Sequence, residues 1–159
     1  MVPAAHIFWS SAWAGIAAAS VERARRFIRK AARNSGGQLP PAAAYLTKAS
    51  TSLRALRALI GDAVVRFQAI EHDAEALGDL GFQTRISLLK VDSSELAQAT
   101  VLSALRACGL SGYRNDSEAS IGRHLRDVLS APIMINNDRI LANLGMTSVM
   151  TSLPTSISG

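Results

Sequence analysis

The chain has 159 residues, of which 48% are apolar, 18% charged and 5% aromatic, and its 17 Lys and Arg outnumber its 12 Asp and Glu. This composition excludes an intrinsically disordered chain, and the length is enough to bury the core of one domain. The single cysteine, Cys108, excludes an intrachain disulfide. Its presence as a lone thiol fits a reducing compartment, and we expect a cytoplasmic protein.

The first predicted helix covers about residues 6–33. Residues 1–21 carry no charged side chain apart from a protonated His6, and the arginine-rich run 23–33 follows directly. A signal peptide has its positive charges ahead of the apolar segment, so the order in this chain argues against a signal peptide. A membrane anchor needs about 20 apolar residues; serines dilute this stretch, and we favour a buried bundle helix. The segment 34–37, Asn-Ser-Gly-Gly, predicts the end of the helix.

The second predicted helix extends from Pro41 to Ile70. Apolar residues recur there at steps of three and four, which predicts a narrow apolar seam on one face. The seam consists of Leu46, Ala49, Leu53, Leu56, Ile60, Ala63, Phe67 and Ile70. Other helices must cover it.

The third predicted helix covers about residues 82–108, after a connection marked by Gly78 and Gly81. Asp92 and Glu95 have the spacing of a capping box, but apolar residues on both sides favour one continuous helix. Its polar and apolar faces are poorly separated, so we expect contacts on more than one side.

Two short helices are predicted after the third one, over about 120–131 and 138–144, with Pro132 between them. The pattern predicts an all-α, up-and-down four-helix bundle formed by residues 1–146. The Ser/Thr-rich residues 147–159 are predicted to form a flexible tail.

Common catalytic motifs are missing from the sequence, which has no phosphate-binding loop, zinc-binding HExxH helix, nucleophile elbow or CxxC pair. His6, His72 and His124 have no second ligand at metal spacing, and we predict no metal site. The arginines of 23–33 surround their helix instead of forming one face, which favours a solvated helix end over a surface for nucleic acid or an anionic membrane.

Three short motifs in the last third of the sequence resemble the C-terminal helical domain of the acyl-CoA dehydrogenase family. That family has a KxxxSE stretch, a helix ending in a Gly-Gly-x-Gly-Tyr pattern and an Arg-x-x-Arg-Asp helix. The matching residues are Lys90, Ser94 and Glu95, then Gly109, Gly112 and Tyr113, then Arg123, Arg126 and Asp127. The resemblance extends from about Phe8 to Asn143.

The resemblance implies a bundle that packs against copies of itself and binds FAD together with a β-rich domain. The implied reaction is the oxidation of an acyl thioester carried by coenzyme A or an acyl carrier protein. Relatives have an N-terminal helical domain and a β-domain ahead of the bundle. We therefore expect this chain to need those domains, in cis or from a partner subunit, and not to turn over alone. The alternative is a non-catalytic oligomerisation or interaction module derived from the same family.

The site residues follow from the same resemblance. Ile135 stands where many members have a catalytic Glu, and isoleucine cannot accept a proton. Asp138 is the remaining carboxylate of this loop, so it is the candidate catalytic base; alternatively, it caps the last helix. The candidate cofactor-binding residues are Arg106, Gly109, Gly112, Asn136 and Asn137.

Overall fold

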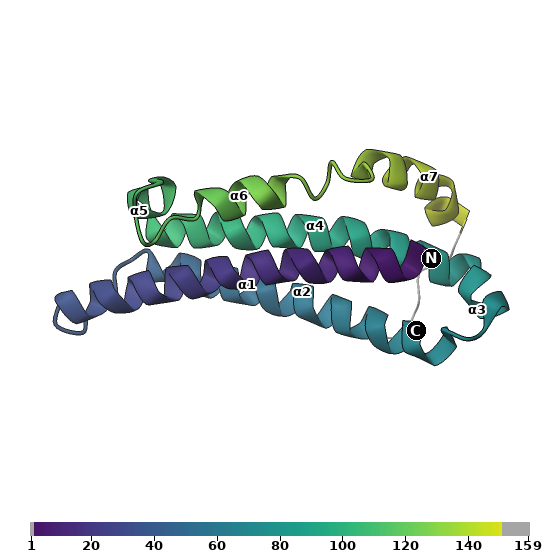
Figure 1. Cartoon of the computed structure of the whole chain (residues 1–159), viewed down its shortest axis with the longest axis horizontal. Coiled ribbons are helices and arrows are strands. Elements are labelled where there is room, and N and C mark those ends of the chain that lie inside the picture. The colour runs from purple at the N-terminus through teal and green to yellow at the C-terminus, as the bar shows by residue number, and fades with distance from the viewer. Residues whose placement is uncertain (1, 151–159) are drawn as a thin grey trace.

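The computed structural model describes residues 2–150, which form seven helices and no strand (Figure 1). The helices are α1 (Val2–Asn34), α2 (Ala43–Ile70), α3 (Ala74–Gly78), α4 (Leu80–Cys108), α5 (Leu110–Tyr113), α6 (Gly122–Leu129) and α7 (Asn137–Met150). The long helices α1, α2 and α4 run up and down beside one another, and α6 and α7 follow each other along α4 as the fourth rod (Figure 1). The predicted all-α four-helix bundle is confirmed.

Helix α4 lies at the centre of the bundle and contacts α1, α2, α6 and α7. It is one continuous helix, as predicted, and small side chains such as Ser94, Ala97, Thr100 and Ala104 are fully buried along it. Small residues allow neighbouring helices to approach α4 from several sides. This central position explains why its sequence lacks separate polar and apolar faces.

Helix α1 begins four residues before the predicted start and ends at Asn34. The glycines beyond it take left-handed backbone angles, with φ of 63° at Gly36 and 92° at Gly37. The Gly37 amide donates to the Ala32 carbonyl at 2.8 Å. This hydrogen bond closes the helix end that the sequence predicted.

Helix α2 begins at Ala43, two residues after the predicted start at Pro41. Its apolar seam faces the bundle, and Ala49, Leu53, Leu56 and Ala63 are buried. The seam predicted from the step of three and four is therefore confirmed.

The α2–α4 connection contains a single-turn helix, α3, that the sequence did not predict. Asp73 caps it, because its Oδ1 accepts hydrogen bonds from the amides of Glu75 and Ala76, both at 3.0 Å. Asp79 caps α4 in the same way through the Phe82 amide at 2.9 Å.

Helix α7 extends to Met150, so it is longer than the predicted 138–144 and enters the predicted tail. Residues 151–159 of that tail lie outside the described residues, and the division at 146 stays a prediction. No helix in the described part of the chain is long and apolar enough to cross a bilayer.

The seam provides a direct test of the core. Leu56 is fully buried, so Leu56→Asp places an unpaired charge in the bundle and should lower the free energy of unfolding by more than about 3 kcal/mol. Val65 lies on the same helix with 66% of its surface exposed. Val65→Asp should change stability by less than about 0.5 kcal/mol. Urea titration followed by circular dichroism measures both, and equal effects would place the core elsewhere.

Candidate functional site

A buried lysine ties the last segment of the chain to the central helix. Lys90 lies in α4, and its side chain is fully excluded from solvent. Its Nζ donates to the backbone carbonyl of Ile135 at 2.9 Å and to Oδ1 of Asn137 at 2.6 Å. The Trp13 ring of α1 lies 5.8 Å from the same nitrogen, within the range of a cation–π contact. Burial lowers the pKa of Lys90, and these three neutral groups oppose that effect by stabilising the ammonium.

Asn137, the first residue of α7, extends these contacts to a second position on α4. Its Nδ2 donates to Oγ of Ser94 at 2.9 Å, and the Ser94 hydroxyl donates to the Val91 carbonyl at 2.7 Å. The Asn137 amide also donates to the Pro132 carbonyl at 2.9 Å. We call Lys90, Ser94, Asn137 and the Ile135 carbonyl the Lys90 network. It holds both the start of α7 and the loop before it against α4.

The loop held by this network contains an unusual backbone conformation. Ile135 has φ of 47° and is the only non-glycine residue among residues 2–150 with positive φ. A β-branched side chain in the left-handed region is strained, at a cost of about 1–2 kcal/mol. The Ile135 side chain is half exposed, and its neighbours Ile133 and Met134 are exposed too. Such strain persists only where surrounding contacts enforce it, and it is concentrated at functional sites.

The start of α7 is capped by Asn136, whose Oδ1 accepts a hydrogen bond from the Asp138 amide at 2.9 Å. The sequence left open whether Asp138 caps this helix. The cap is the side-chain oxygen of Asn136, and not the carboxylate of Asp138. The Asp138 side chain is exposed in the first turn of α7. Its role as a base stays a prediction.

The opposite end of the bundle has a basic groove of about 800 Å³ between the end of α1 and the segment that follows α5. Arg23, Arg26 and Lys30 line it together with Ser111, and Glu118 is the acidic residue of its wall. Arg23 donates to the Ser120 carbonyl at 3.2 Å, and Lys30 lies 3.8 Å from the Glu118 carboxylate. The groove therefore presents an excess of positive charge.

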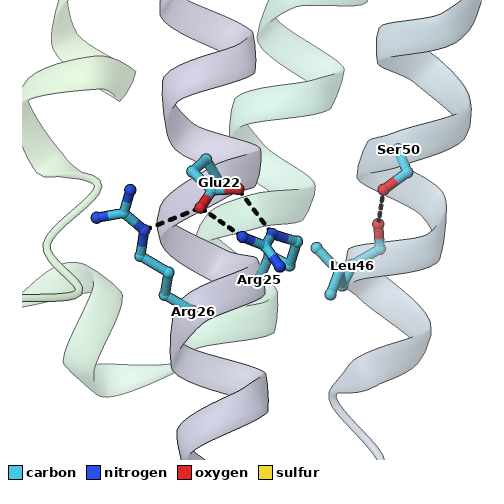
Figure 2. A network of polar contacts seen from close by, with 5 residues as sticks. All are labelled: Glu22, Arg25, Arg26, Leu46 and Ser50. Carbon is cyan, nitrogen blue, oxygen red and sulfur yellow. Dashed lines mark hydrogen bonds and ion pairs between the residues drawn. The ribbon is translucent and has the colours of Figure 1, made fainter.

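Part of the arginine cluster on α1 is internally compensated. Figure 2 shows Glu22 between Arg25 and Arg26, which donate to its carboxylate at 2.7 and 2.9 Å. The hydrogen bonds from Arg25 and then Arg26 lower the pKa of Glu22 to about 2. Arg23 and Lys30 are thus the cations of the groove that Glu22 does not neutralise.

The predicted glycine turn forms the end of α4 next to this groove. Gly109 ends the helix with φ of 56°. Gly112 is buried, and a Cβ on it would lie 2.7 Å from Cβ of Cys108 and 3.1 Å from the Leu105 carbonyl. The Gly112 carbonyl also accepts a hydrogen bond from the Ile121 amide at 2.7 Å. Close packing thus accounts for the glycine at 112. Positive φ accounts for the glycine at 109.

The six predicted site residues fall into two separate groups. One group lies at the end of α4, and the other lies at the start of α7 beside the Lys90 network. The first group is Arg106, Gly109 and Gly112; the second is Asn136, Asn137 and Asp138. Arg106 follows Lys90 by 16 positions on α4, and at a rise of 1.5 Å per residue this separates the two groups by about 24 Å. The predicted residues therefore do not meet at one compact place on this chain.

Two members of the Lys90 network, Lys90 and Ser94, were not predicted as site residues. Both belong to the KxxxSE stretch of the family resemblance, and a lysine between Leu89 and Val91 is the signal that could have marked Lys90 as a buried cation. Groups of three or more His, Cys, Asp or Glu able to hold a metal ion are not found in the described part of the chain. Burial raises the pKa of Cys108 to about 11, so its thiol stays protonated at neutral pH.

A comparison with protein families matches residues 7–149 to the family described as acyl-CoA dehydrogenase, C-terminal domain. The matched range includes both the Lys90 network and the glycine turn. Comparisons with curated proteins and with solved structures found no match.

The packing at the glycine turn predicts unequal effects of alanine substitutions. Gly112→Ala should lower the free energy of unfolding by about 1–3 kcal/mol, because the new methyl group overlaps Cys108. Gly61, inside α2, has no atom within 4 Å of its added Cβ. Gly61→Ala should therefore stabilise the chain, by up to about 1 kcal/mol. Denaturant unfolding measures both, and an undisturbed Gly112→Ala variant would contradict the close contact.

The buried His6 and the half-buried His124 predict that the folded chain loses stability in acid. Burial, with a smaller effect of Lys90, lowers the pKa of His6 despite its hydrogen bond to the Ile86 carbonyl, and burial and Arg23 lower that of His124. Below pH 6.5 the unfolded chain therefore binds more protons than the folded chain, and the free energy of unfolding decreases as the pH is lowered.

The free energy of unfolding should decrease between pH about 7.5 and about 5, where unperturbed histidine titrates. His6→Gln should reduce this pH dependence, whereas the matched change His72→Gln at an exposed position should leave it intact. An unchanged slope in the His6 variant would refute the assignment.

Proposed function

The chain belongs to the acyl-CoA dehydrogenase family, of which it contains the C-terminal domain, and on this premise we propose that it is the bundle of a divergent FAD-dependent oxidoreductase. The substrate class is an acyl thioester, presented by coenzyme A or by an acyl carrier protein. The observation that carries the proposal is the basic groove beside the glycine turn, because it provides the charge that a dinucleotide requires.

The residues of the groove fit a diphosphate. Arg23 and Lys30 supply cations, and the Ser111 hydroxyl supplies a neutral donor on the same wall. Arg106 and Gly109, predicted cofactor-binding residues, lie at the adjoining end of α4. When bound, FAD supplies the acceptor for the hydride removed from the acyl chain.

The chemistry at the other end is assigned to the loop held by the Lys90 network. Ile135 cannot take a proton, so Asp138 is the carboxylate that this loop offers as a base. The exposed side chains of Ile133, Met134 and Ile135 form an apolar surface suited to an acyl chain. Asn136 and Asn137 act on this loop, by capping α7 and by joining the Lys90 network.

The enzyme is completed by an N-terminal helical domain and a β-domain, in cis or in a partner subunit, and by further copies of this bundle. A bundle offers one wall of a flavin site, whereas catalysis requires groups positioned on all sides of the substrate. Exposed apolar residues on α1 and α2, among them Phe8 and Tyr45, support association with other chains.

A second candidate function is a non-catalytic oligomerisation or interaction module derived from the same family. The observation that favours it is Ile135, which occupies the place of the family's usual base. This module would associate with the same partners and bind no flavin.

Co-expression with the polypeptide that carries the N-terminal and β-domains tests the proposal. The expected result is a co-purifying yellow complex with flavin absorbance. Arg23→Gln/Lys30→Gln should weaken FAD binding about tenfold or more, because two charge-assisted contacts are lost. The matched variant Lys48→Gln/Arg54→Gln removes two exposed cations of α2 and should bind FAD normally.

A colourless complex would support the module instead of the flavoenzyme. Failure to associate at all would contradict both candidates. Equal FAD affinity in the two double variants would exclude the groove as the diphosphate site.

A further inference from the structure

The strained residue and the buried cation of this fold meet at one atom. Ile135 has a left-handed backbone, and its carbonyl oxygen accepts a hydrogen bond from Lys90 at 2.9 Å. An exposed loop residue without such a contact would relax to negative φ, because a β-branched side chain is disfavoured in the left-handed region. The hydrogen bond from Lys90 to the carbonyl of residue 135 is a contact that can hold this conformation.

The chain is also fixed on both sides of that carbonyl. The Asn137 amide donates to the Pro132 carbonyl at 2.9 Å, which closes the loop into a tight turn. The Asn137 side chain accepts from Lys90 at 2.6 Å and donates to Ser94 at 2.9 Å. Because Asn137 orients the ammonium and the turn limits the path of the backbone, the Ile135 carbonyl points inward while its side chain stays half exposed.

We propose that Lys90 is a positioning residue: it holds the Ile135 carbonyl and thereby imposes the left-handed backbone that presents side chain 135 at the surface. The proposal rests on the proposed function, since the presented side chain would then face the acyl thioester. It also deepens that function. Lys90 acts on the backbone, so it presents whatever side chain stands at 135, and in this chain it presents an apolar group to the ligand.

A purely structural lysine is the competing explanation. A buried lysine whose hydrogen bonds are satisfied stabilises the packing of α4 against α7 and has no influence on φ at 135. Both explanations predict that removal of Lys90 destabilises the chain. Only the positioning role predicts that the strain at residue 135 depends on Lys90, and a double-mutant cycle measures that dependence.

The cycle combines Lys90→Met with Ile135→Gly on the full chain without flavin. Glycine adopts positive φ without strain, so Ile135→Gly relieves strain only while Lys90 enforces the left-handed backbone. We expect the change in Tm caused by Ile135→Gly to be more favourable in the wild-type background than in the Lys90→Met background, by about 2–4 °C. Effects on the unfolded chain and loss of the isoleucine side chain occur in both backgrounds and cancel in the difference.

Ile133 offers the matched control, because it lies in the same loop, is 77% exposed and has no positive φ. Ile133→Gly should shift Tm equally in both backgrounds. Equal shifts for Ile135→Gly as well would overturn the proposal.

Hydrogen exchange gives a second readout that does not require Lys90→Met to fold. Asn137→Ala removes the side chain that orients Lys90, so residues 133–136 should exchange their amide protons faster while the interior of α4 keeps its protection. Unchanged exchange in the loop would contradict the proposal. Because neither experiment involves flavin, loss of the proposed function through failed FAD binding would be recognised separately.

Discussion

A cation buried among neutral groups is the constraint on which the docking of the last segment of this bundle depends. Lys90 is removed from water, and its ammonium is stabilised by a backbone carbonyl, an asparagine amide oxygen and an indole ring. An unsatisfied buried charge would be very costly, so these contacts must form together. Because the carbonyl and the amide come from residues 135 and 137, the charge of Lys90 determines where the last segment of the chain docks.

Helix α4 connects this docking point to the basic groove at the other end of the bundle. Its first half carries Lys90 and Ser94, and its end carries the turn at Gly109 and Gly112 beside the basic groove. The helix is buried on several sides, so its two ends are held at a constant separation. The end of α1 contributes basic side chains to the groove, and the loop before α7 exposes the apolar residues Ile133, Met134 and Ile135.

The loop at residues 132–136 combines a strained backbone with an exposed apolar side chain at Ile135. The backbone at Ile135 has positive φ, and its carbonyl accepts a hydrogen bond from the buried Lys90. Isoleucine at that position supplies apolar surface and no proton acceptor. Among residues 132–138, Asp138 is the only residue with a carboxylate side chain.

The sequence by itself determined the helices, because periodic apolar residues and glycine stops are local signals. The seam of α2, the continuity of α4 and the end of α1 at Gly36 and Gly37 were all predictable in this way. The extension of α7 and the single turn of α3 were not, since short helices depend on caps and packing more than on periodicity.

Only the tertiary structure decided which polar residues meet. Asn137 follows Lys90 by 47 residues and Ser94 by 43 in the chain, and it meets them because α7 docks on α4. Local patterns carry no information on such a contact, so the sequence could mark Asn136 and Asn137 through family resemblance but not Lys90 as their partner. The positive φ of Ile135 was not predictable either, because a β-branched residue by itself disfavours the left-handed region.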